Sequence, residues 1–124
     1  QHLWYALPSG RVLCYPFAKF DGEEITYVKA AWKPAADAKE WPRARLWRGL
    51  ACENITQAIA NDLLRHSLRQ LPETVLHVHD EIVLESATPE ESAAQLQQVM
   101  CTPPEWAQGL PLSAEVEIMS RYGK

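Results

Sequence analysis

Residues 74–86 read Thr74-Val75-Leu76-His77-Val78-His79-Asp80-Glu81-Ile82-Val83-Leu84-Glu85-Ser86. Two apolar runs rich in β-branched residues flank a polar group, which consists of His79, Asp80 and Glu81. In one straight strand, the two-residue side-chain period would place Asp80 on the same face as Val78 and Ile82 and would bury its carboxylate. We therefore predict a central β-hairpin with Asp80 and Glu81 at the tip of a tight turn.

This turn points to a function because its residues are unusual for a hairpin. Gly and Asn, which favour tight turns, are absent, and two adjacent acids take their place. Negative charge concentrated in this way favours a divalent metal ion, and the alternative is a solvated turn without function. A zinc-dependent hydrolase using His77, His79 and Asp80 is another alternative, but a third histidine at suitable spacing is absent, and packing is the simpler role for His77.

The composition indicates one compact domain. The chain has 124 residues, of which 47% are hydrophobic and 23% are charged. The net charge of -4 by itself argues against a nucleic-acid-binding domain, unless the chain is the acidic catalytic part of a larger protein, and its start at Gln1 leads us to expect such a parent. Three widely spaced cysteines indicate neither a disulfide framework nor a zinc knuckle. Without a membrane-length apolar run or a secretion signal, we expect a soluble, intracellular and cytoplasmic protein.

The first part of the chain has the pattern of a small antiparallel meander. Apolar runs at 3–7 and 11–17 are separated by a Pro-Ser-Gly turn, and a third run follows at 24–32 after an Asp-Gly turn. We therefore predict a β meander over residues 1–32. Residues 33–48 have no clean period and are predicted to be a connection, with a short strand at 45–47.

Helical periodicity begins near residue 49 and continues to 71. The apolar side of this helix is made of Ile55, Ile59, Leu63, Leu64 and Leu68. Its polar row is made of Glu53, Asn54, Gln57 and Asn61, which would ordinarily be the wet face of an amphipathic helix.

Residues 88–124 are predicted to form a second helix and a last strand. Thr88 as a capping hydroxyl, Pro89 and two acids mark the start of the helix, which is expected to end near Cys101. A single turn is expected at 105–107, and alternation predicts the strand at 114–119. The whole pattern indicates an α+β fold, an antiparallel sheet backed by helices.

Several of these segments resemble family A DNA polymerases, the polymerase I type, and in particular their phage and prophage members. The hairpin is similar to the motif C of that family, through Val78-His79-Asp80-Glu81-Ile82-Val83-Leu84-Glu85. The first helix is similar to the palm helix that carries a glutamine, through Glu53-Asn54-Ile55-Thr56-Gln57-Ala58-Ile59-Ala60-Asn61-Asp62-Leu63-Leu64. Three flanking pieces are also similar, namely Leu7-Pro8-Ser9-Gly10-Arg11, Trp106-Ala107-Gln108-Gly109-Leu110-Pro111-Leu112 and Arg121-Tyr122-Gly123-Lys124.

The resemblance implies a polymerase palm and a role for each matching residue. Asp80 would bind Mg²⁺ in a two-metal site, and Glu81 would be the secondary acid that orients water or the primer end. His79 would steady the primer terminus. Gln57 would contact the minor groove of primer-template DNA, with Asn54 as a weaker candidate beside it.

The resemblance also implies that this chain holds part of a polymerase. The motif A strand, with its metal-binding Asp, and the motif B helix are absent, and Arg48-Gly49-Leu50 stands where the phage type has Gly-Gly-Lys. We therefore expect the chain to need the remainder of a polymerase chain, besides deoxynucleoside triphosphates, and to be inactive alone. The remaining alternative is a non-catalytic palm remnant that binds DNA or another partner.

Overall fold

The structure is a computed structural model that describes residues 1–30 and 41–123. The chain divides into two compact units, residues 1–58 and 59–124, and the boundary falls within one long helix, α1 (Arg48–Leu68). Part of the predicted strand at 24–32 and half of the predicted connection at 33–48 lie outside the described residues. No helix in the described ranges has the length and apolar character needed to cross a membrane.

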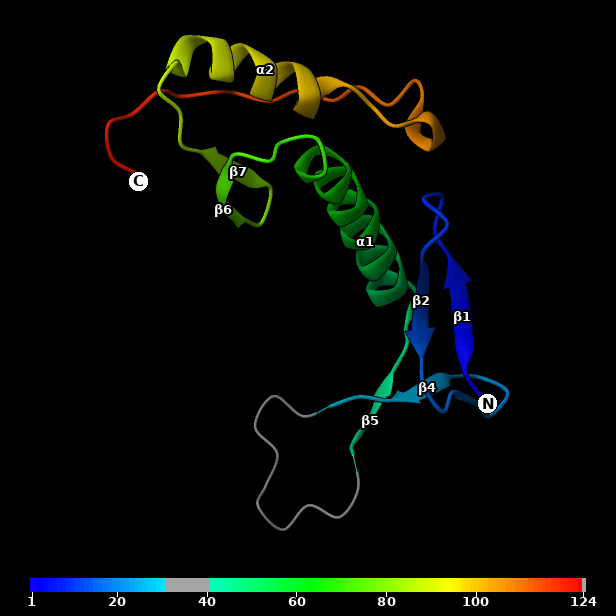
Figure 1. The fold of residues 1–124 in the computed structure, drawn as a ribbon. Helices are drawn as coiled ribbons and strands as arrows, with labels where there is room; N and C mark the ends of the chain where they lie inside the picture. The colour runs from blue at the N-terminus through cyan, green and yellow to red at the C-terminus, as the bar shows by residue number, and fades with distance from the viewer. Residues whose placement is uncertain (31–40, 124) are drawn as a thin grey trace. The chain divides into compact units, whose positions relative to one another are not determined.

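The first unit contains two small antiparallel sheets (Figure 1). The first sheet is a hairpin of β1 (Leu3–Ala6) and β2 (Val12–Tyr15). The second has the order β3-β4-β5, made of β3 (Lys19–Phe20), β4 (Ile25–Val28) and β5 (Arg43–Arg45). The predicted meander is therefore divided between two sheets, and the short strand expected at 45–47 lies slightly earlier.

Two buried tyrosines connect these sheets with the start of α1. The rings of Tyr15 on β2 and Tyr27 on β4 meet edge to face, with centroids 5.1 Å apart. The amide Nδ2 of Asn54 donates a hydrogen bond of 3.1 Å to the hydroxyl of Tyr15. Arg11 donates from Nη2 to the carbonyl oxygen of Ala58, also at 3.1 Å, so the hairpin is attached to α1 at two places.

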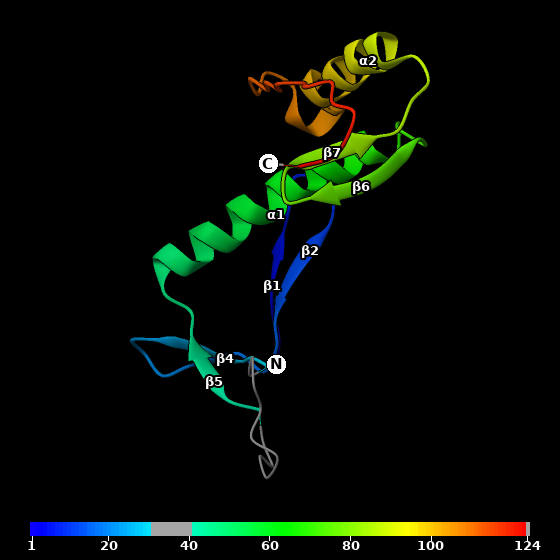
Figure 2. The ribbon, with the colours of Figure 1, turned by 90° about the vertical axis from the view of Figure 1, so that its left-hand side faces the viewer.

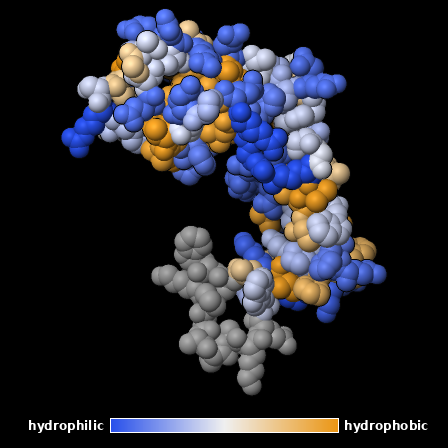
Figure 3. Space-filling model, in the orientation of Figure 1, coloured by the Kyte–Doolittle hydropathy of each residue, from blue (hydrophilic) through white to orange (hydrophobic). Residues whose placement is uncertain are grey.

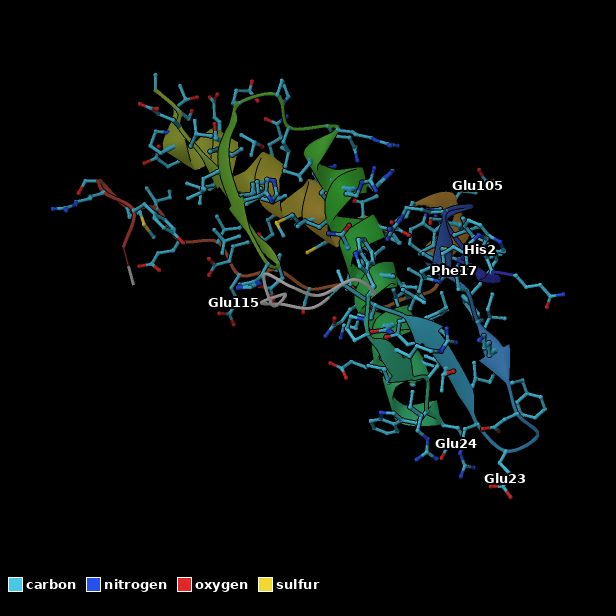
Figure 4. All side chains as sticks on the ribbon, turned by 90° about the horizontal axis from the view of Figure 1, so that it is seen from below. His2, Phe17, Glu23, Glu24, Glu105 and Glu115 are labelled. Carbon is cyan, nitrogen blue, oxygen red and sulfur yellow. The ribbon has the colours of Figure 1, made fainter. Side chains whose placement is uncertain are left out.

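A second aromatic group in this unit is exposed. His2 and Phe17 lie side by side, with ring centroids 5.0 Å apart (Figure 4). The backbone N–H of Phe17 donates to Nδ1 of His2 at 3.2 Å, and Phe17 has a φ of 50°, which is uncommon for a residue other than glycine. The side-chain contacts hold the backbone of Phe17 in this left-handed conformation.

The second unit is built around a small hydrophobic core to which its helices and its hairpin contribute side chains. Its elements after α1 are β6 (Thr74–Val78), β7 (Glu81–Leu84), α2 (Pro89–Cys101) and the short 3-10 helix η1 (Glu105–Ala107). Leu64, Leu71 and Ile82 are buried together, and the surrounding half-buried side chains are Leu68, Leu84, Leu96, Val99 and Met100. The core therefore joins α1, β7 and α2, and it supports the predicted hairpin of β6 and β7 from one side.

The helices begin and end nearly where the sequence predicts. α1 ends at Leu68, three residues before the predicted position and shortly before Pro72. α2 starts with Pro89 at its first turn, but the hydroxyl of Thr88 makes no capping hydrogen bond. Ser86 instead accepts hydrogen bonds from the N–H of Thr88 at 3.0 Å and from the hydroxyl of Ser92 at 2.6 Å. Ser86 therefore orders the residues just before α2, but the expected side-chain cap of the helix is not formed.

The strand predicted at 114–119 is wrong for the described residues, which show no strand there. The chain is extended and runs back along α2, as both ribbon views show (Figures 1 and 2). Leu112, Ala114 and Val116 are half-buried, while the residues between them are exposed, and Gln97 on α2 donates to the carbonyl oxygen of Ala114 at 3.2 Å. The alternation is thus real, but the partner of this segment is a helix.

The α+β class is confirmed. In the described residues, five strands precede α1 and two more lie between α1 and α2, and these antiparallel strands form three small sheets of two, three and two strands. The central hairpin predicted from residues 74–86 is present as a sheet of its own.

Candidate active-site hairpin

The turn of the central hairpin has two residues, His79 and Asp80. Val78 on β6 is paired with Glu81 on β7, so the turn lies one residue earlier than predicted and Glu81 belongs to the strand. His79 has a φ of 53°. A positive φ at the first turn position matches the right-handed twist of the two strands, and glycine usually occupies such a position. The histidine thus accepts a conformation that most side chains avoid.

The three predicted residues around this turn differ in exposure. Asp80 and His79 are exposed at the tip, and Glu81 is half-buried. The hydroxyl of Tyr122 donates a hydrogen bond of 3.2 Å to Oε2 of Glu81. The carboxylate of Asp80 therefore lies at the end of the hairpin. The carboxylate of Glu81, the next residue, is half-buried and held by a hydrogen bond.

His77 does not have the packing role that the sequence suggested. It is paired with Ile82 across the hairpin, but its side chain is exposed. Among the described residues, no group of three or more His, Cys, Asp or Glu side chains could hold a metal ion. The hydrolase alternative therefore lacks the cluster of His77, His79 and Asp80 that it requires.

The two predicted DNA-binding residues lie on the first half of α1. Gln57 is exposed, and its Nε2 donates to Oε1 of Glu53, one helical turn earlier, at 3.2 Å. Asn54 is half-buried and donates to Tyr15. Gln57 is thus available on the surface, whereas one function of Asn54 is to hold the tyrosine pair. These residues belong to the first unit and the hairpin residues to the second.

Sequence reasoning missed three residues that fix the site or its support. Tyr122 contacts Glu81 from 41 positions away, and no periodicity relates two residues at such a separation. Arg11 and Tyr15 anchor the first hairpin to α1. Arg11 and Tyr122 do lie within the segments 7–11 and 121–124 that resemble the polymerase family. That resemblance does not indicate which residues their side chains contact.

Comparison with known proteins finds that this chain is similar to a DNA polymerase. A curated DNA polymerase from Bacillus phage SP02 is 35% identical to this chain over 98% of its length, and the chain spans 20% of that polymerase. No family model matches the chain, and no solved structure matches it. The similarity therefore covers nearly all the described elements, including the hairpin and α1, and corresponds to about one fifth of the phage protein.

Proposed function

We propose that this chain is the C-terminal palm portion of a family A DNA polymerase, which performs template-dependent nucleotidyl transfer in DNA replication. Its support is the similarity to a phage DNA polymerase along 98% of this chain, together with the hairpin that carries His79, Asp80 and Glu81. The partners in this proposal are primer-template DNA, deoxynucleoside triphosphates and the remainder of the polymerase chain. The compartment would be the cytoplasm, and the parent a phage or prophage enzyme.

The observation that carries the proposal is the exposed position of Asp80 at the hairpin tip. Carboxylate oxygens are the ligands that Mg²⁺ prefers, and an exposed turn leaves room for the water molecules that this ion keeps. Asp80 would supply one ligand, and a carboxylate elsewhere in the polymerase would supply its partner. When bound, paired Mg²⁺ ions lower the proton affinity of the primer hydroxyl and stabilise the negative charge on the leaving pyrophosphate.

The other residues would position the reactants. His79, next to Asp80 in the turn, has an imidazole that can hydrogen-bond to the sugar or phosphate of the primer end. Glu81 would orient water or the primer end. The exposed amide of Gln57 both donates and accepts hydrogen bonds, which suits the acceptor atoms that every base pair presents in the minor groove. Asn54 would support this surface through its bond to Tyr15.

Substitution of Asp80 tests the proposal directly. In a full-length polymerase that carries this sequence, Asp80→Ala should abolish nearly all nucleotide incorporation, by about a hundredfold or more, because the metal loses a charged ligand. Glu90→Gln, at an exposed acid on α2, is the matched control and should retain activity. If Asp80→Ala keeps normal incorporation, the chain is a non-catalytic palm remnant, and the proposed site is wrong.

A second measurement concerns the chain alone. With Mg²⁺, primed template and all four nucleotides, the 124-residue chain should incorporate no nucleotide. The reason is that the carboxylate proposed as the partner of Asp80 in the two-metal site lies on a polymerase strand outside this chain. Robust incorporation would mean that the partner of Asp80 lies within these residues.

A further inference from the structure

The last described residues return to the candidate hairpin. Tyr122 donates its hydroxyl hydrogen to Oε2 of Glu81, with 3.2 Å between the two oxygen atoms. Glu81 is the first residue of β7 and directly follows Asp80. Figure 2 shows the C-terminal segment ending close to β7. The contact therefore links the end of the chain to the carboxylate next to the proposed metal ligand.

The segment that carries Tyr122 is attached to the same core as the hairpin. Gly109, with a φ of 87°, reverses the chain after η1, and the side chain of Gln97 then holds the carbonyl oxygen of Ala114. α2, to which Gln97 belongs, contributes Leu96, Val99 and Met100 to the core around Ile82. α2 therefore contacts both the returning segment, at Ala114, and the core that includes Ile82 of β7, while the contact of Tyr122 itself with the hairpin is its hydrogen bond to Glu81.

The contact restricts what Glu81 can do. A glutamate side chain has three rotatable bonds, so an unbound carboxylate at the edge of a hairpin samples many orientations. A phenol hydroxyl that donates to Oε2 selects among them and occupies one acceptor site of the carboxylate. The bond thus restricts the directions in which Glu81 can accept hydrogen bonds from water or from the primer end.

We propose that Tyr122 is a positioning residue of the polymerase site, which holds Glu81 beside the turn so that Glu81 orients water or the primer end. This inference rests on the proposed function. The tyrosine itself contacts neither metal nor substrate in this assignment, and its whole effect on the reaction passes through Glu81.

A double-mutant cycle in a full-length polymerase that carries this sequence tests the inference. Tyr122→Phe keeps the ring and removes the hydroxyl, and we expect kcat to fall roughly three- to tenfold with little change in the KM for nucleotide. In the background of Glu81→Ala, the same substitution should change kcat by less than about twofold, since its target is gone. Tyr5→Phe is the matched control, because Tyr5 is 43% exposed and Tyr122 is 45% exposed, and it should leave kcat unchanged.

Two outcomes would overturn the inference while leaving the proposed function intact. One is a normal kcat for Tyr122→Phe in an enzyme that Asp80→Ala inactivates, and the other is an undiminished effect of Tyr122→Phe in the Glu81→Ala background. Activity retained by Asp80→Ala would overturn both proposals.

A spectroscopic measurement gives a result that does not depend on activity. In carbon-detected NMR of the 124-residue chain, the carboxyl signal of Glu81 should move in Tyr122→Phe and remain in place in Tyr5→Phe. A carboxyl signal that does not move in Tyr122→Phe would mean that the hydroxyl does not hold Glu81, and the inference would be wrong.

Discussion

Asp21 shows how one exposed side chain can stabilise a turn. Its Oδ1 accepts hydrogen bonds from the backbone N–H groups of Glu24 at 2.8 Å and Glu23 at 3.0 Å, and these bonds hold the pKa of Asp21 below its ordinary value. Because the folded pKa is lowered, the stabilisation is complete above the carboxyl pKa of the unfolded chain and is lost as the pH falls through the folded value.

Substitutions of Asp21 should separate its charge from its shape. Asp21→Ala removes the acceptor and should lower stability at neutral pH, whereas Asp21→Asn keeps an oxygen in the same place and should lose less. Urea unfolding between about pH 6 and about pH 2 measures this, and the acid-dependent loss of stability should be smaller in both variants than in the wild type. Equal acid dependence in all three proteins would contradict the role given to Asp21.

Tyr27 should make the fold sensitive to alkali. Burial, followed by the neighbouring Tyr15, raises the pKa of Tyr27 above its ordinary value. The raised folded pKa means that stability is complete below the unfolded pKa and falls as the pH rises above about 10. Tyr27→Phe should therefore unfold less readily than the wild type at high pH, by circular dichroism. Tyr5→Phe, at an exposed position, should behave like the wild type.

Among the elements, the central hairpin was predictable because its sequence carries two signals that agree. β-branched runs predict the strands, and the cost of burying a carboxylate predicts the bend between them. The register of the turn was wrong by one residue, since His79 takes a positive φ that no glycine or asparagine marks. Local sequence patterns thus located the central hairpin, but they could not show that Glu81 belongs to its second strand.

The C-terminal segment shows the limit of periodicity. Alternation at 112–116 describes an extended chain with one covered face, and a helix covers that face as well as a neighbouring strand would. The hydrogen bond from Tyr122 to Glu81 depends on this path and was therefore not predictable. The sequence was therefore sufficient to identify His79, Asp80 and Glu81 as candidate site residues. It was not sufficient to predict the contact with Tyr122, because that contact depends on tertiary packing.

Leu71 should be the most sensitive position of the small core. It is 1% exposed, where the chain leaves α1 towards β6, and it packs with Leu64 and Ile82. Leu71→Ala should lower the free energy of unfolding by about 3 kcal/mol, because it removes buried methyl groups and leaves a cavity. Leu110→Ala, at a side chain that is 43% exposed, should cost less than about 1 kcal/mol in the same urea titration.

At the scale of the whole molecule, many large apolar side chains are exposed to solvent. The first unit exposes many large apolar side chains, namely Leu3, Trp4, Tyr5, Val12, Phe17, Phe20, Trp41 and Trp47. Figure 3 shows hydrophobic residues, in orange, on the surface. Single exposed apolar residues are ordinary, but so many in a short segment indicate a surface that other protein groups would cover.

This surface predicts how the 124-residue chain behaves in solution. It should bind an apolar fluorescent dye and self-associate at high concentration, because exposed aromatic side chains are removed from water in both cases. Phe20→Ser combined with Trp4→Ser should reduce dye fluorescence and association, measured by light scattering. Val75→Ser, at an exposed side chain of β6, is the control for a general change in surface polarity, and a similar reduction in that variant would contradict the assignment to the first unit.

The β-bulge in β6 determines where this strand can lose a residue without changing the turn of the hairpin. Thr74 is paired with Leu84 and Leu76 with Val83, so Val75 is an extra residue in the ladder. A chain that lacks this one residue could form an unbroken ladder with the same two-residue turn. Relatives whose first strand lacks this residue are therefore compatible with the same two-residue turn, whereas a deletion of His77 would place Leu76 opposite Ile82 and on the other face of the strand.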